Sequence, residues 1–362
     1  MPDFQAATTA STAPNLPGRC ALLSDYALFR ASGSDAATFL HGQLTNDVTA
    51  LDATNARLAG FCTAKGRLLA NMVIWRSAGA ERAADGHDVS AAYIGDHPDD
   101  PDTHEVRIMG FMRQSLADTV IKRLRMFVLR AKVTFDTPQA RLHGVWAGAQ
   151  HLAALSDAAG GELPTTAWAR VSLPSGTWIA APHEAATLRW WWLANPAQHD
   201  QAAAPLSGVL AQADQSEWRQ QDVAQGLPWI EAGTQDLFIP QTVNLDLIDG
   251  VSFTKGCYPG QEIVARSHYL GKVKRRMTLG SLATPTGDAS IANDDAALAG
   301  VDVFESGDMG EPCGRIINAA SLNGVTSVLL ETTLTAMTQP ELRLRAGDGP
   351  VIALRALPYA LA

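Results

Sequence analysis

The sequence has few cysteines, few charges and no long apolar run. Its 362 residues include four cysteines, and 18% of the residues are charged. Cys20, Cys62, Cys257 and Cys313 form no CxxC pair and no Cys/His cluster, which argues against a disulfide framework and against a closed zinc or iron–sulfur site. No run reaches the roughly 18 apolar residues of a membrane span, and residues 1–18 lack the features of a secretory signal. We therefore expect a cytoplasmic protein with no membrane partner and no metal site of its own.

The net charge of −9 argues against a general polyanion binder. Basic residues are nevertheless concentrated in two runs, Arg113 to Lys132 and Arg266 to Arg276. Each run fits a solvated surface or a face that meets an anionic ligand. Because the chain also carries no RNA-binding signature, direct nucleic-acid binding is the least favoured interpretation.

Hydrophobic patterning predicts several elements in the first two thirds of the chain. The Lys65-Gly66 turn signal lies between two apolar runs and predicts a hairpin, in which Asn71 is the odd polar member of one face. Apolar residues at four-residue steps predict a helix over 112–129, followed by a strand around Phe127 to Phe135. The run of three tryptophans at 190–192 is typical of a strand buried on both faces.

The last third of the chain has a different pattern. After His268, short β-rich runs are separated by Gly, Pro, Asn and Asp, which predicts an all-β domain, most simply a small barrel. The expected organisation is a flexible tail (1–18), a first α+β region (19–140), a second α+β region interleaved with it (141–268) and the barrel (269–362).

The densest cluster of unusual residues is FTKGCYPGQEIVAR, residues 253–266. Pro259 suits the first position of a helix, which would place Cys257 just outside a helix N-terminus. The helix dipole and the nearby Lys255 would both favour the thiolate. A lone cysteine is more often a small buried apolar residue, and we prefer that interpretation for the other three cysteines.

Within that cluster, KGCYPGQEIVAR resembles the signature of the folate-binding YgfZ family, which is distantly similar to the aminomethyltransferase (T-protein) of glycine cleavage. GQLTNDV at 42–48, AKGR at 64–67 and FIPQ at 238–241 follow in family order. The resemblance implies an α+β fold, a three-domain ring of the T-protein type with a C-terminal β-barrel domain. It also implies a bound tetrahydrofolate or one-carbon derivative.

The resemblance assigns roles to particular residues. Cys257, Lys255 and Tyr258 match the functional cysteine motif, and Tyr26 and Trp218 match the folate-contacting aromatic residues. Three further candidate folate contacts lie in the same motif: Gln261, Glu262 and Arg266. Two positions depart from the pattern. Ala70 and Asn71 stand where the T-protein has a catalytic carboxylate, and Ala224 replaces a glutamate that can bond a pterin.

These observations favour a folate-binding auxiliary protein that supports assembly or repair of iron–sulfur clusters in client enzymes, including tRNA-modifying ones. Its partners would be those clients or assembly proteins, besides the folate. A single thiol at the motif can at most share a cluster with a partner. The alternative is a folate-dependent one-carbon (aminomethyl) transferase that uses Cys257 as its nucleophile. Whether the chain is an enzyme thus stays open at this stage.

Overall fold

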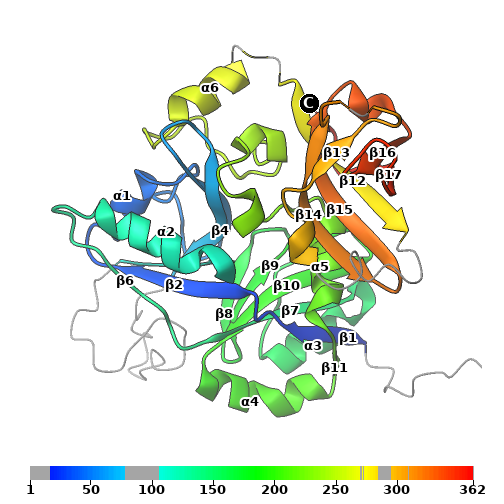
Figure 1. Ribbon diagram of the computed structural model, residues 1–362. Helices are drawn as coiled ribbons and strands as arrows, with labels where there is room; N and C mark the ends of the chain where they lie inside the picture. The colour runs from blue at the N-terminus through cyan, green and yellow to red at the C-terminus, as the bar shows by residue number, and fades with distance from the viewer. Residues whose placement is uncertain are drawn as a thin grey trace, which may run out of the picture.

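The computed structural model describes residues 17–77, 106–269, 271, 273–283, 295–308 and 310–361. Most of the predicted tail lies outside the described residues, and its last residue, Gly18, begins strand β1 (Gly18–Leu22). Figure 1 shows three bodies: a five-stranded sheet, a six-stranded sheet and a barrel. No helix in the described part of the chain is long and apolar enough to cross a membrane.

The five-stranded sheet carries two helices. Its strands, in spatial order, are β3 (Ala56–Cys62), β4 (Leu68–Arg76), β5 (Arg107–Arg113), β2 (Tyr26–Ser32) and β6 (Thr134–Asp136). Helix α1 (Ala36–His41) contacts β5, and α2 (Gln114–Met126) packs on the sheet through Leu116, Val120 and Leu124. The predicted hairpin and the predicted long helix are both confirmed.

The strand predicted around Phe127 to Phe135 is wrong over most of its length, because only Thr134–Asp136 pairs with a neighbour. Residues 127–133 instead form the turn and connection after α2, where Phe127 and Leu129 are 46% and 88% exposed. Apolar residues form a strand only where another strand can pair with them. Thr134 pairs with Ser32, the last residue of β2, so residues 127–133 lie beyond the end of that strand.

The six-stranded sheet is covered on both faces. In spatial order it contains β11 (Leu210–Gln212), β1, β7 (Arg141–Gly148), β10 (Thr187–Ala194), β9 (Gly176–Ala180) and β8 (Arg170–Leu173). Trp190 and Trp192 pack with residues of α3 (Leu152–Ala159) and α4 (Pro196–Ser207), whereas Trp191 belongs to the core on the other face. All three tryptophans are buried, so the prediction of a doubly buried strand is confirmed.

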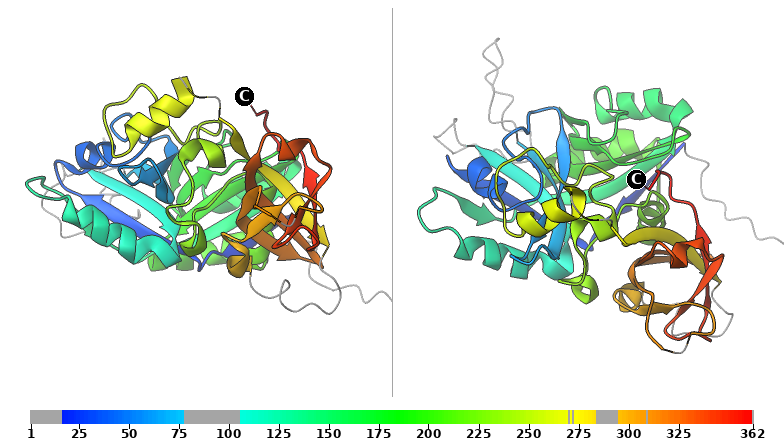
Figure 2. Two further views of the ribbon diagram at one scale, coloured as in Figure 1. Left: turned by 45° about the horizontal axis from the view of Figure 1, so that its top comes forward. Right: turned by 90° about the horizontal axis from the view of Figure 1, so that it is seen from above.

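The predicted C-terminal barrel is also confirmed. Its strands close in the order β12 (Arg275–Ala283), β15 (Val325–Thr333), β14 (Gly314–Leu322), β13 (Asp302–Phe304), β16 (Glu341–Leu344) and β17 (Val351–Arg355). Strand β16, four residues long, was not predicted. Figure 2 shows from above that the barrel lies to one side of the two sheets.

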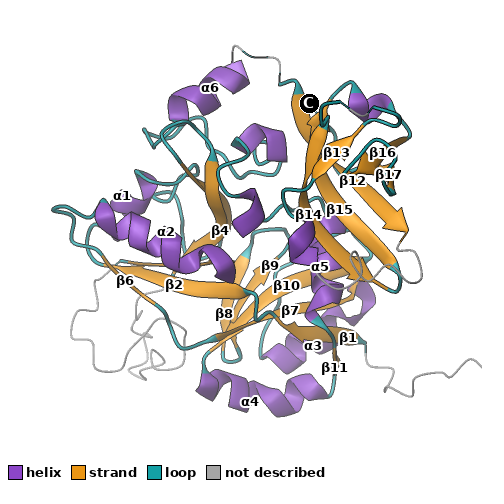
Figure 3. Cartoon of the chain, in the orientation of Figure 1, coloured by secondary structure: helices purple, strands orange, loops and turns teal. Residues whose placement is uncertain are grey.

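The remaining elements connect these bodies, as the colouring by secondary structure in Figure 3 shows. Helix α5 (Gln215–Ala224) follows β11, and α6 (Gln261–Tyr269) precedes the barrel. The short 3-10 turns are η2 (Ala149–His151), η3 (Ala232–Thr234), η4 (Pro240–Val243), η5 (Asp295–Leu298) and η6 (Ala336–Thr338).

Residues 226–231, which we call the strap, connect the five-stranded sheet to the barrel. Asn71 of β4 donates from Nδ2 to the Pro228 carbonyl (2.8 Å) and accepts at Oδ1 from the Ile230 amide (2.7 Å). Asn318 of β14 bonds both backbone groups of Trp229, at 2.7 and 2.8 Å. Because an asparagine offers one donor and one acceptor side by side, it can pair with a backbone as a neighbouring strand would. Asn71, which the resemblance aligns with a T-protein carboxylate, therefore has a structural role in this chain.

Replacing Asn71 by aspartate should destabilise the fold, because a carboxylate cannot donate to the Pro228 carbonyl. We expect Asn71→Asp to lower the free energy of unfolding by about 2–4 kcal/mol at neutral pH. The buried carboxyl group would have a raised pKa, so the loss should grow as pH rises above about 4. Urea unfolding at pH 5 and pH 8 measures both effects.

The matched control is Asn323→Asp in the exposed turn between β14 and β15, where the same change should alter stability by less than about 0.5 kcal/mol. Equal stability of the two variants would show that Asn71 does not hold the strap.

His143 of β7 generates a second prediction. Its ring stacks on Trp192 (4.7 Å between centroids) and on His199, and burial lowers its pKa from 6.5 to about 4. Below about pH 6.5 the unfolded chain binds a proton that the folded chain does not. The free energy of unfolding should therefore fall as pH drops from 6.5 to 4, by up to about 3 kcal/mol.

His143→Phe keeps a flat ring and removes the titrating group, so its stability should vary less over this pH interval, whereas the partly exposed His151→Gln should retain the wild-type slope. An identical slope in His143→Phe would contradict this account. Chemical unfolding at half-unit pH steps provides the comparison.

Candidate functional site

The two predicted folate-contacting rings lie at the centre of the molecule and are joined through Asp222 of α5. Tyr26 Oη donates to Asp222 Oδ2 (3.2 Å), and Arg189 of β10 donates to Asp222 Oδ1 (2.5 Å). The Arg189 guanidinium lies 4.0 Å over the ring of Trp218. Tyr26 is 6% exposed and Trp218 is fully buried, and burial raises the pKa of Tyr26. Both rings are therefore part of the core.

A second group of charges lies beside this core. Arg113 of β5 forms ion pairs with Asp25 and with Glu231 (3.1 Å), and Arg219 of α5 reaches Asp25 at 2.8 Å. Burial raises the pKa of Glu231, although Arg113 opposes that shift. Several buried polar atoms here have no hydrogen-bond partner among the described residues: Asp25 Oδ1, Arg113 Nε, Arg189 Nε, Trp191 Nε1 and Trp218 Nε1. The centre thus has unused donors and one unused acceptor.

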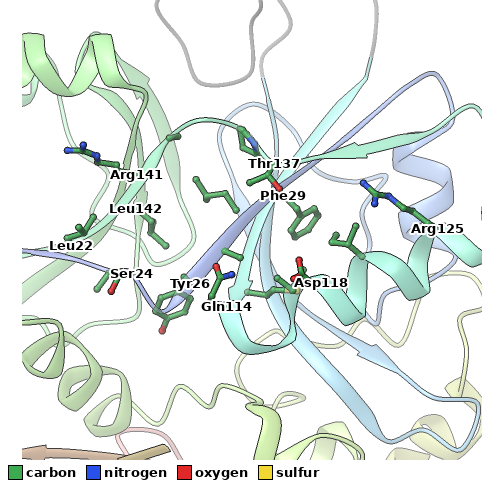
Figure 4. Close-up of a pocket in the computed structure, with 18 residues that line it drawn as sticks. Leu22, Ser24, Tyr26, Phe29, Gln114, Asp118, Arg125, Thr137, Arg141 and Leu142 are labelled. Carbon is green, nitrogen blue, oxygen red and sulfur yellow. The ribbon is translucent and has the colours of Figure 1, made fainter.

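A pocket of about 410 Å³ opens beside α2. Figure 4 shows Asp118 and Arg125 projecting from α2 on one side, and Arg141 lying on the other. Tyr26 also lines this pocket, and most of the other lining residues are apolar. Trp218 is not among the lining residues, so only one of the two predicted aromatic contacts borders this pocket.

Lys255 anchors the motif loop to helix α1. Its Nζ donates to the carbonyl oxygens of His41 and Leu44, the latter at 2.6 Å, and it lies 5.0 Å from the centre of the Tyr258 ring. Lysine at the C-terminal end of a helix satisfies carbonyl groups that have no partner within the helix. Burial lowers the pKa of Lys255 to about 8, and its ammonium group also interacts electrostatically with Cys257.

Cys257 is the exposed cysteine of the four, and the fold shields the other three to different degrees. Cys20 and Cys62 are buried, and burial raises the pKa of each to about 12. Cys313 is partly exposed, and desolvation raises its pKa as well. The chain therefore presents one thiol openly to a partner.

The predicted start of the helix after Cys257 is wrong by two residues. Helix α6 begins at Gln261, and residues 259 and 260 form a turn in which Gly260 has a φ of 81°. Cys257 therefore lies four residues before the helix, beyond the first turn to which the dipole effect is confined. Lys255, rather than the helix dipole, is the positive group that influences this thiol.

The three candidates on α6 lie on the surface. Glu262 and Arg266 form an ion pair of 3.2 Å with side chains that are 82% and 64% exposed, and such pairs stabilise proteins little. Gln261 is partly exposed at the start of the helix. Across the described residues, no hydrogen bond or ion pair connects these three side chains to Tyr26 or Trp218.

Two residues beside the motif loop were not predicted. His41 ends α1, and its Nδ1 lies 3.0 Å from Asp47 Oδ1. A Cβ atom on Gly256 would lie 3.5 Å from Nε2 of the same ring. His41 directly precedes the GQLTNDV segment and Asp47 lies within it, so their position in the sequence could have identified them as candidate site residues. Their proximity to the motif depends on the tertiary fold.

The chain was compared with known proteins. No protein-family model matches it. A tRNA-modifying protein YgfZ from Yersinia pseudotuberculosis is 31% identical over 365 residues, covering 99% of this chain and 97% of the relative. The protein of the same name from Sodalis glossinidius is 30% identical, covering 96% and 94%.

Among solved structures, the glycine cleavage system aminomethyltransferase T from Bartonella henselae matches with a TM-score of 0.64 and 13% identity. The match covers 95% of this chain and 87% of that chain, so the predicted T-protein fold is confirmed. Identity of about 30% over nearly the full length establishes the relationship. The chain belongs to the YgfZ family of tRNA-modifying proteins.

Proposed function

We propose that this chain is a folate-binding auxiliary protein that supports assembly or repair of iron–sulfur clusters in client enzymes, including enzymes that modify tRNA. The observation that carries the proposal is the single exposed thiol, Cys257, on a loop that Lys255 fixes to the body of the protein. The name of the relatives, tRNA-modifying protein, supports tRNA modification as the affected process. The cytoplasm, where thiols stay reduced, suits this role.

One thiol determines how the protein can act on a cluster. Stable iron–sulfur sites need several thiolate ligands, and the described residues contain no group of three or more His, Cys, Asp or Glu that could hold a metal ion. Cys257 would therefore supply one ligand to a cluster whose other ligands come from a client, or react transiently with the cysteines of that client. Its exposure allows either contact without opening the fold.

The basic runs fit action through client enzymes better than direct binding of tRNA. In the first run, Arg113 forms buried ion pairs and Arg125 donates to the Phe135 carbonyl (2.6 Å). Binding to a polyanion needs several free cations in a continuous patch. Arg113 is buried and cannot contribute to such a patch, and Arg125 already uses one of its donors within the protein.

The pocket beside α2 suits a folate in size and chemistry. Its volume of about 410 Å³ lies within the usual range for small-molecule sites. Tyr26 contributes its small exposed part to the wall, Asp118 can accept from ring N–H groups, and Arg125 and Arg141 can pair with carboxylates of the folate tail. The bound folate would supply or accept a one-carbon group.

Tetrahydrofolate should bind less tightly when Arg141 loses its charge. Because a charge-assisted hydrogen bond to a carboxylate would be removed, we expect Arg141→Gln to weaken binding about tenfold in titration calorimetry. Arg130→Gln changes an exposed arginine that does not line the pocket and should leave affinity unchanged. Wild-type affinity in Arg141→Gln would exclude this pocket as the folate site.

Cys257→Ser should abolish support of iron–sulfur enzymes while the protein stays folded, because a hydroxyl group is a far poorer nucleophile and metal ligand at neutral pH. The measurement is complementation of a strain that lacks its homologue. Activity of an iron–sulfur enzyme and the level of a tRNA modification made by such an enzyme are both scored.

Cys313→Ser is the matched control, since this partly exposed thiol lies next to barrel strand β14, outside the motif loop. It should complement as well as the wild type. Full complementation by Cys257→Ser would refute the proposed thiol mechanism.

A further inference from the structure

His41 is held in one orientation by its neighbours. Its Nδ1 lies 3.0 Å from Asp47 Oδ1 and 3.3 Å from Thr49 Oγ1. Asp47 Oδ1 also accepts from Thr49 Oγ1 (2.7 Å) and from the Ala50 amide (3.0 Å). Burial would raise the pKa of Asp47, but these hydrogen bonds outweigh it and hold that pKa below its ordinary value. Asp47 is thus a carboxylate at neutral pH.

The orientation leaves one nitrogen of the ring available. Because a carboxylate accepts and cannot donate, Nδ1 carries the proton that points to Asp47, and Nε2 is then the basic nitrogen. Nε2 faces the motif loop, since it lies 3.5 Å from the position that a Gly256 Cβ would take. Lys255, which bonds the His41 carbonyl, fixes the loop and the ring on the same helix end.

We propose that His41, oriented by Asp47, accepts the proton of the Cys257 thiol. The S–H bond breaks, its electron pair stays on Sγ, and the proton forms a new N–H bond at His41 Nε2. Asp47 then stabilises the imidazolium. A nucleophile, a base and a group that orients the base are the three parts of many cysteine sites, and their contacts are often loose until a substrate is bound. The inference rests on the proposed function of Cys257 and adds the base that activates it.

The charged groups around Cys257 and His41 determine how far the proton transfer between them proceeds. Asp47 favours the imidazolium, and Arg57 interacts with Asp47. Lys255 opposes a second positive charge on His41 but favours the thiolate, with which its ammonium group interacts. Tyr258 stays neutral at pH 7, because burial raises its pKa. The product would be a thiolate and an imidazolium between one anion and one cation.

The test measures the rate of Cys257 alkylation by iodoacetamide from pH 5.5 to 9.5, followed by mass spectrometry of its peptide. His41→Gln should lower the rate constant at pH 7 about tenfold and move the profile toward that of an unassisted thiol, which ionises near pH 8.5. Asp47→Asn should change the rate in the same direction by a smaller factor. If His41→Gln does not fold, as judged by circular dichroism, Asp47→Asn alone decides.

His151→Gln, in turn η2 of another part of the fold, is the control and should react as the wild type does. In urea all variants should react at one rate. An unchanged or faster rate at pH 7 in the folded variants overturns the proposal. If the rate is unchanged or faster but Cys257→Ser fails to complement, the proposed function of Cys257 is retained and only the role of His41 as its base is rejected. Full complementation by Cys257→Ser would instead refute the thiol mechanism of the proposed function.

Discussion

The strap between α5 and η3 is held by side-chain hydrogen bonds from three directions. Asn71 reaches it from the five-stranded sheet, Asn318 from the barrel, and Asp222 Oδ2 from α5, where it accepts from Trp229 Nε1 at 3.1 Å. Every buried backbone donor and acceptor needs a hydrogen-bond partner, and at this buried junction these side chains supply the partners. Two amides and one carboxylate therefore attach the strap to the five-stranded sheet, to the barrel and to α5.

The buried centre, the thiol and the pocket lie in different parts of the molecule. The centre contains Tyr26, Trp218 and their charged partners, tightly packed, and it cannot also expose a reactive group. The thiol lies on a separate loop that Lys255 attaches to α1. The pocket beside α2 lies on a third surface, with Tyr26 between it and the centre. The folate binding and the thiol chemistry that we propose are therefore assigned to two different places on the fold.

Local patterns in the sequence predicted the hairpin before Asn71, the tryptophan strand and the barrel, because each is set by neighbouring residues and turn signals. The family motif predicted the T-protein fold. The pairing of Asn71 with the strap could not be predicted, since its partner is 157 residues away. For the same reason, the anchoring of Lys255 to His41, 214 residues away, and the burial of Trp218 appear only in the tertiary structure.

The central claim is that this fold shields three thiols and offers one. Its most direct test is the order in which the four cysteines of the native protein are alkylated, read by mass spectrometry before and after unfolding in urea. The account predicts that Cys257 is modified first, Cys313 more slowly, and Cys20 and Cys62 only after unfolding. Modification of Cys257 no faster than Cys20 or Cys62 in the native protein would contradict it.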